Sequence, residues 1–368
     1  MFNGYINGKL GFGCMRLPMK DNEVDKEHFC RMADAFMQAG FNYFDTAHGY
    51  IGGKSEKAIR DCVSARYKRQ DFVLANKLSC WYFEKEEEVV PLFEKQLELC
   101  GVDYFDFYIF HSINRDGYAK HKRCNTFEIV KKLKEQGKIK HIGMSFHDTA
   151  DFLDEILAEQ PCVEVVQLQF NYLDYDDPTV QSKACYDVAV KHGKKIIVME
   201  PVKGGALADL SEKASDALKV LGDGSAASYA LRFAASYPEV FMVLSGMGNT
   251  EMMDDNINTF KEFVPIDKKD METFETVRNI MRKENQIPCT KCNYCAEVCP
   301  CDIPISEIFA VYNSLAGARK PRWEAQKELL QYREKLDSCI KCGKCEGNCP
   351  QSIKIREELE KIPKTLNE

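Results

Sequence analysis

The sequence predicts an α/β protein: a closed parallel (β/α)8 barrel followed by a small α-rich domain. Its 368 residues exceed what one hydrophobic core usually organises. Short apolar runs alternate with amphipathic helical patterns from residue 10 to about residue 260. Nine of the seventeen cysteines fall between Cys289 and Cys349, which sets the end of the chain apart. We therefore expect a barrel over residues 1–267 and the small domain over residues 268–368.

Eight apolar runs have the length and turn-bounded ends of buried strands. They cover residues 10–13, 43–45, 72–75, 105–110, 140–145, 165–170, 196–200 and 240–245. Helical spacing predicts helices over residues 28–39, 56–66, 87–99, 126–135, 150–157, 180–191, 225–236 and 252–260, with a linker helix over 268–282. Eight such units in about 250 residues match a closed barrel. The alternative, an open doubly wound sheet, would normally carry a glycine-rich dinucleotide turn after its first strand, and residues 11–16 lack that pattern.

Composition excludes several classes of protein. The net charge of −7 argues against a surface that binds nucleic acid through bulk basicity. No apolar stretch approaches the roughly 20 residues of a membrane helix, and the first residues do not form a secretory leader. We therefore expect a cytoplasmic protein with no nucleic-acid or membrane partner. Its scattered cysteines, such as Cys62 and Cys100, are expected to be reduced core residues.

Two cysteine runs repeat one spacing, C-x2-C-x2-C-x3-C-P, which is the ligand run of two-cluster ferredoxins. The tight loop presents three thiolates to one cluster, and the fourth cysteine reaches the other cluster. Zinc, the alternative, gives no reason for the repeated fourth Cys-Pro. We predict two [4Fe–4S] clusters in a ferredoxin-like iron–sulfur domain, with Cys301 as a packing residue. One ligand set is Cys289, Cys292, Cys295 and Cys349, and the other is Cys339, Cys342, Cys345 and Cys299.

Four polar residues fall at or just after the ends of successive predicted strands. Asp45 ends the second strand and Tyr50 follows it, Lys77 follows the third strand, and His111 follows the fourth. Taken singly, such residues are more often a turn cap, a solvated lysine or a core histidine. Because the carboxyl ends of barrel strands converge at one mouth, the four together predict a catalytic group.

This set resembles the tetrad of the aldo/keto reductases, and the resemblance extends over residues 10–260. The whole chain is similar to the subgroup with a C-terminal ferredoxin-type domain. The resemblance implies hydride transfer between NAD(P)H and a small-molecule carbonyl or alcohol, with Tyr50 as general acid in reduction and base in oxidation. The Lys77 ammonium would lower the phenol pKa from about 10. Asp45 would hold Lys77, and His111 would orient the substrate oxygen and share in proton transfer.

The resemblance also implies a dinucleotide site. Its expected residues are Gly13, Met15, Ser145, Gln167, Met199, Pro201, Val202, Gly204, Gly205, Gly246, Met247, Asp255 and Asn256. Met199 stands where the family usually stacks an aromatic ring on the nicotinamide. Gly246 and Met252 stand where the family usually has cationic ligands of the NADP 2′-phosphate. NAD(H) and NADP(H) therefore both stay open, and the backbone amides of the 246–248 turn are an alternative phosphate ligand.

Two hypotheses account for clusters on a reductase, because hydride carries two electrons and a cluster transfers one. In the first, hydride transfer is direct and the clusters are structural or sensing elements. In the second, the clusters relay electrons between ferredoxin or another redox protein and a barrel-bound flavin or other redox cofactor. A non-enzymatic sensor is a third possibility, which the intact tetrad disfavours. The loops over residues 79–85 and 112–125 are expected either to face the substrate or to pack against the iron–sulfur domain, and both alternatives stay open.

Overall fold

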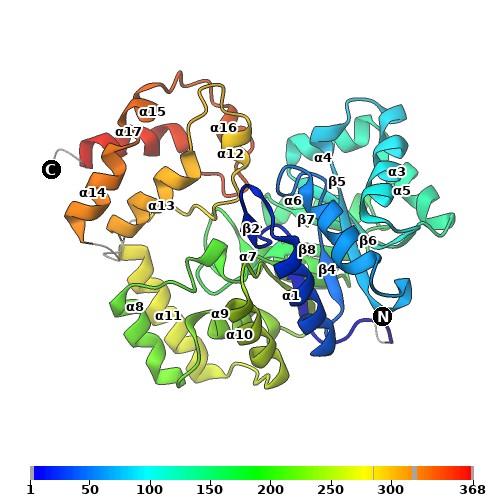
Figure 1. Ribbon diagram of the computed structural model, residues 1–368, viewed down its shortest axis with the longest axis horizontal. Coiled ribbons are helices and arrows are strands. Elements are labelled where there is room, and N and C mark those ends of the chain that lie inside the picture. The colour runs from blue at the N-terminus through cyan, green and yellow to red at the C-terminus, as the bar shows by residue number, and fades with distance from the viewer. Residues whose placement is uncertain (1–3, 285, 317–320, 366–368) are drawn as a thin grey trace. The chain divides into compact units, whose positions relative to one another are not determined.

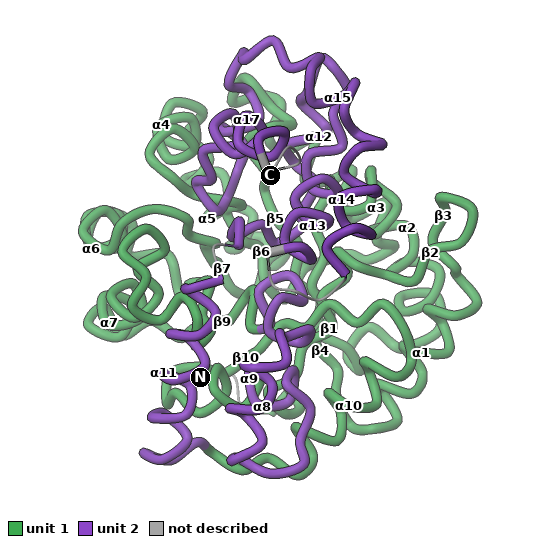
Figure 2. The backbone as a smooth tube through the Cα atoms, turned by 90° about the vertical axis from the view of Figure 1, so that its left-hand side faces the viewer, with its two compact units in different colours: residues 1–201, 231–265 green, residues 202–230, 266–368 purple. Residues whose placement is uncertain are grey.

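The computed structural model describes residues 4–284, 286–316 and 321–365. The chain divides into two compact units, coloured separately in Figure 2. The first unit is Met1–Pro201 with Leu231–Pro265, and the second is Val202–Ala230 with Ile266–Glu368. The predicted boundary after residue 267 stays a prediction, and residues 202–230 group with the C-terminal part of the chain. No helix in the described ranges is both long enough and apolar enough to cross a membrane.

Eight parallel strands close into a ring in the order β1-β10-β9-β8-β7-β6-β5-β4, which confirms the predicted (β/α)8 barrel (Figure 1). The strands are β1 (Leu10–Gly13), β4 (Tyr43–Asp45), β5 (Val73–Ser79), β6 (Phe105–Ile113), β7 (Ile139–Phe146), β8 (Val165–Gln169), β9 (Lys195–Met199) and β10 (Val240–Ser245). Inside the ring, a cluster that includes Tyr43, Phe107 and Ile197 is fully buried. Because both faces of these strands are covered, their sequences are apolar runs rather than alternating patterns.

Helices follow most strands, as expected. In the barrel they are α1 (Lys26–Gln38), α2 (Lys54–Ile59), α3 (Val89–Cys100), α4 (Arg115–Arg123), α5 (Thr126–Glu135), α6 (Ala150–Glu159), α7 (Ser182–Lys191), α9 (Ala226–Ala235) and α10 (Thr250–Lys261). Two features were not predicted: α4 within the supposed loop 112–125, and a hairpin of β2 (Met19–Lys20) and β3 (Glu23–Val24). The single helix predicted over 56–66 is α2 continued by the π-helical turn η1 (Arg60–Ser64).

The second unit is helical. It contains α8 (Glu212–Leu218), α11 (Lys268–Lys283), α12 (Tyr294–Glu297), α13 (Ile305–Ala316), α14 (Arg322–Leu330), α15 (Arg333–Asp337), α16 (Lys344–Gly347) and α17 (Ile355–Thr365). Its core joins isoleucines such as Ile308 and Ile362 to the cysteines of both motifs. A reciprocal capping box between Asp267 and Asp270 begins α11. The expected small α-rich domain is therefore present.

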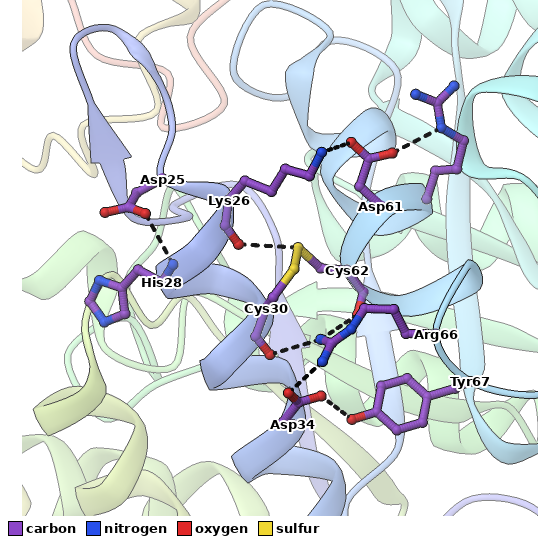
Figure 3. Close-up of a disulfide and its surroundings, with 10 residues drawn as sticks. Asp25, Lys26, His28, Cys30, Asp34, Asp61, Cys62, Arg66 and Tyr67 are labelled. Atoms are coloured by element: carbon purple, nitrogen blue, oxygen red, sulfur yellow. Dashed lines mark hydrogen bonds and ion pairs between the residues drawn. A yellow bond between two sulfur atoms is a disulfide. The ribbon is translucent and has the colours of Figure 1, made fainter.

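A disulfide joins Cys30 on α1 to Cys62 on η1, whose Cα atoms lie 4.7 Å apart (Figure 3). The expectation of a reduced Cys62 is therefore wrong, although this residue is fully buried as predicted. The pairing could not be predicted from the sequence, because 32 positions separate the two cysteines and only the packing of α1 against η1 brings them together. Ion pairs between Lys26 and Asp61 and between Asp34 and Arg66 flank the bond.

Candidate functional site

Asp45 and Lys77 form a buried ion pair at the carboxyl end of the barrel. Asp45 is the last residue of β4, whereas Lys77 lies within β5 rather than after it. Lys77 Nζ lies 2.5 Å from Asp45 Oδ1 and donates a hydrogen bond to Thr46 O at 2.9 Å. Both side chains are almost completely buried, at 1% and 3% exposure. The ammonium is therefore held by two fixed acceptors.

Tyr50 lies beside this pair on the loop that follows β4. The chain turns back after Tyr50 through Ile51, Gly52 and Gly53, which all have positive φ. Lys77 Nζ lies 4.8 Å from the centroid of the Tyr50 ring. The same ring lies 6.0 Å from the ring of His111, edge to face. The four residues predicted at the strand ends therefore lie together.

Burial governs the electrostatics of this group. Burial, followed by the positive charge of Lys77, holds the pKa of His111 well below its usual value, so the imidazole is neutral at neutral pH. Burial also lowers the pKa of Lys77 against the opposing attraction of Asp45. It raises the pKa of Asp45 against the attraction of Lys77. We take the pair as ionised, because the short contact and the Thr46 carbonyl both favour an ammonium.

Two histidine contacts in this region were not predicted. Ser79 Oγ lies 2.6 Å from His111 Nδ1. His48 Nδ1 lies 2.7 Å from Oε2 of the buried Glu56. Trp81 and Tyr82, from the expected substrate loop, lie edge to face against His111 and His48 respectively. The sequence did offer a signal for the two ring contacts, because the aromatic residues Trp81 and Tyr82 follow β5 closely.

The nicotinamide residues predicted on β7 and β8 are neighbours. Ser145 and Gln167 are paired in the strand register, and both are buried. Within the described chain, Gln167 Oε1 is buried and has no hydrogen-bond partner. Ser145 Oγ accepts a bond from Ser112 N at 2.7 Å, which leaves its own hydroxyl hydrogen available. An unsatisfied amide oxygen beside a hydroxyl fits the carboxamide of a nicotinamide.

The predicted phosphate turn after β10 is closely packed against the loop that follows β1. A Cβ atom added to Gly13 would lie 3.2 Å from Ser245 O, and one added to Gly246 would lie 3.2 Å from Arg16 Cδ. Asn256 donates to Ser245 Oγ at 2.8 Å, and Met252 is exposed. The side chain of Arg16, which the sequence analysis did not single out, therefore packs against this turn.

The remaining predicted dinucleotide residues are distributed over both units. Met247 and Pro201 are buried, whereas Met15 and Met199 are half-buried. Asp255 lies on α10. Three residues belong to the second unit: Val202, Gly204 and Gly205.

In that second unit, Gly204 packs against the cluster loop. Its φ is +62°, and an added Cβ would lie 2.3 Å from Thr290 O, so only glycine fits there. Ser211 donates a hydrogen bond to Glu284 on the segment after α11. The segment 202–230 is thereby tied to the part of the chain that carries the first cysteine motif.

Two cavities in the second unit are lined by cysteines. One is lined by Cys289, Cys292, Cys295 and Cys349. The other is lined by Cys299, Cys339, Cys342 and Cys345, with Cys301 also at its wall. Each motif thus contributes its fourth cysteine to the other cavity. Four thiols at each cavity are the ligand number of a [4Fe–4S] cluster.

The fold and these sites define a barrel oxidoreductase with a cysteine-rich C-terminal domain. The sequence profile of the aldo/keto reductase family matches residues 9–279, and that of the 4Fe-4S dicluster domain matches residues 288–354. The chain belongs to the aldo/keto reductase family and carries a C-terminal 4Fe-4S dicluster domain.

Curated relatives agree with this assignment. An uncharacterised oxidoreductase, YqkF of Bacillus subtilis, is 23% identical over 280 residues, which are 68% of this chain and 86% of YqkF. L-galactose dehydrogenase of Arabidopsis thaliana is 24% identical over 292 residues, 74% of this chain and 90% of that enzyme. The mouse aldo-keto reductase family 1 member C13 is 30% identical, over 39% of this chain and 48% of its own length.

Solved structures show the same fold. The holo form of aldo-keto reductase AKR11C1 from Bacillus halodurans aligns with a TM-score of 0.61 and 23% identity, over 73% of this chain and 91% of that chain. An aldo-keto reductase from Klebsiella pneumoniae in complex with NADPH aligns with a TM-score of 0.60 and 18% identity, over 73% and 90%.

Proposed function

We propose that this protein transfers hydride between a nicotinamide dinucleotide and a small-molecule carbonyl or alcohol, with Tyr50 exchanging a proton with the substrate oxygen. The observation that carries the proposal is the position of Lys77. Its ammonium lies 4.8 Å from the centre of the Tyr50 ring and 2.5 Å from Asp45 Oδ1, out of contact with bulk water. A proton donor of this kind is needed because reduction of a carbonyl leaves an alkoxide.

Each member of the group has a distinct role. The dinucleotide supplies or accepts the hydride when it is bound. The Lys77 ammonium stabilises negative charge on the Tyr50 oxygen as the proton leaves. Asp45 fixes the position of Lys77 and balances its charge. The neutral His111 donates a hydrogen bond that orients the substrate oxygen.

We propose NADP(H) as the preferred dinucleotide. Gln167 and Ser145 would hold the nicotinamide carboxamide, and Arg16 with the amides of the 246–248 turn would hold a phosphate. The NADPH complex of the Klebsiella pneumoniae neighbour is consistent with this choice. NAD(H) is the alternative. The dissociation constants of the protein for NADPH and for NADH distinguish the two choices.

The decisive test is Tyr50→Phe, assayed without oxygen by NADPH oxidation in the presence of simple aldehydes. We expect kcat/KM to fall by about 10²- to 10⁴-fold, the usual contribution of a general acid. The dissociation constant for NADPH should stay unchanged, because the phenol does not hold the dinucleotide. Turnover that survives in Tyr50→Phe would contradict the proposal.

We propose that the two cysteine-lined cavities hold [4Fe–4S] clusters, which supply one-electron chemistry when bound. Anaerobic purification should give about eight irons per chain.

A second candidate function, exchange of electrons with ferredoxin or another redox protein, is favoured by one observation: Cys342 and its neighbour Ile340 are exposed. Turnover that requires a one-electron donor would support it. No observation favours a flavin. We propose a cytoplasmic location because the motif cysteines must stay reduced to bind clusters, although the Cys30–Cys62 disulfide is unusual in that compartment.

A further inference from the structure

Ser79 and His111 face one another across two adjacent strands. They are direct partners in the parallel register of β5 and β6. Ser79 Oγ lies 2.6 Å from His111 Nδ1, and the two residues are only 1% and 7% exposed. The contact is therefore fixed by the barrel itself rather than by a mobile loop. It is the hydrogen bond that the structure gives to this ring nitrogen.

The contact decides which nitrogen of the imidazole carries the hydrogen. A neutral imidazole has one N–H group, and its location is set by the partner of the other nitrogen. If the serine hydroxyl donates to Nδ1, the hydrogen of the ring is at Nε2. If Nδ1 donates to the hydroxyl oxygen, Nε2 is left as an acceptor. A carbonyl oxygen only accepts hydrogen bonds, so only the first arrangement allows His111 to bind the substrate oxygen.

We propose that Ser79 is a positioning residue that donates its hydroxyl hydrogen to His111 Nδ1 and so holds the imidazole as the Nε2–H tautomer that donates to the substrate carbonyl. This inference rests on the proposed function. Trp81, whose ring lies 5.4 Å from that of His111, packs edge to face against the imidazole and restricts its rotation. The serine sets the tautomer, and the tryptophan limits the orientation.

The proposal is tested on the full-length protein with its clusters, labelled with ¹⁵N-histidine. The His111 signals are identified as those lost in His111→Gln. In the wild type, we expect Nε2 to carry the hydrogen and Nδ1 to show the shift of an unprotonated, hydrogen-bonded nitrogen. In Ser79→Ala, the two tautomers should mix. The kcat for aldehyde reduction should fall about 10- to 100-fold while the KM for NADPH is unchanged. Ser79→Thr keeps the hydroxyl and should restore both the tautomer and the rate.

Ser182→Ala is the matched control. Ser182 is equally buried and makes a hydrogen bond of 2.7 Å to Gln169 O at the start of α7, so its loss disturbs the barrel without touching His111. It should leave the tautomer and kcat unchanged. A wild-type His111 with its hydrogen at Nδ1 would overturn the inference, whether or not Ser79→Ala folds. If Tyr50→Phe retains turnover, the proposed function fails, and the tautomer measurement still reports on Ser79 independently.

Discussion

At the scale of single residues, the buried pair of Asp45 and Lys77 carries two separable properties. The pair stabilises the barrel only while both members are present, because a lone buried charge is costly. The same ammonium is required for the chemistry proposed for Tyr50. Stability and activity should therefore respond differently to single and double substitutions.

Lys77→Met should lower the free energy of unfolding by about 3–5 kcal/mol and abolish reduction, since it leaves the Asp45 carboxylate buried without a partner. The double variant Asp45→Asn with Lys77→Met should recover most of that stability and none of the activity. Denaturant unfolding and the aldehyde assay measure the two effects. Recovery of turnover in the double variant would show that the ammonium is dispensable.

Arg16→Ala should weaken NADPH binding about tenfold more than NADH binding, since a charge-assisted bond to phosphate is lost. Fluorescence titration with each dinucleotide measures this difference. Arg31→Ala is the control, because Arg31 lies on the exposed face of α1, paired with Glu27. An equal loss for both dinucleotides would place Arg16 at a phosphate that NAD and NADP share.

At the scale of elements, the strands and the cluster motifs could be predicted from buried apolar runs and cysteine spacing. Contacts between segments distant in the sequence could not be predicted. The strands β1, β4 and β10 match their predicted bounds because each is an apolar run between turn residues. Lys77 and His111 were expected just after their strands but lie inside longer ones, because the apolar pattern stops at a polar residue while the hydrogen-bonded ladder continues. The contact of Arg16 with the 246–248 turn, like the Cys30–Cys62 bond, depends on packing that no local pattern encodes.

The Cys30–Cys62 disulfide between α1 and η1 should add about 3–4 kcal/mol to the free energy of unfolding, because it closes a chain segment of 32 residues in the unfolded state. Cys30→Ser should lose that amount in denaturant unfolding without reductant. With a dithiol reductant present, the variant and the wild type should have similar free energies of unfolding. Cys162→Ser, at a half-buried free cysteine, is the control and should have little effect. A wild type insensitive to the reductant would show that the thiols are not joined in solution.

At the scale of the whole molecule, the clusters should decide whether the second unit folds. Its helices α12 and α16 have four residues each, too short to persist alone, and the motif cysteines belong to its core. Cluster binding and folding are therefore expected to be one process.

Serine substitution of Cys292 and Cys342 should make residues 266–365 sensitive to protease, and residues 202–230 should become sensitive with them. The strands of the barrel should stay protected. Mass spectrometry of limited digests locates the cuts, and Cys301→Ser, outside both motifs, should behave like the wild type. Continued protection of 202–230 would mean that this segment is ordered without its partners Thr290 and Glu284.

The placement of residues 202–230 has a consequence for engineering this chain. The polypeptide leaves the barrel after β9, contributes to the iron–sulfur unit, and returns to supply β10. Truncation of the chain before residue 268 would therefore not leave an intact, simpler protein. The segment 202–230 would lose Thr290 and Glu284, the partners of Gly204 and Ser211.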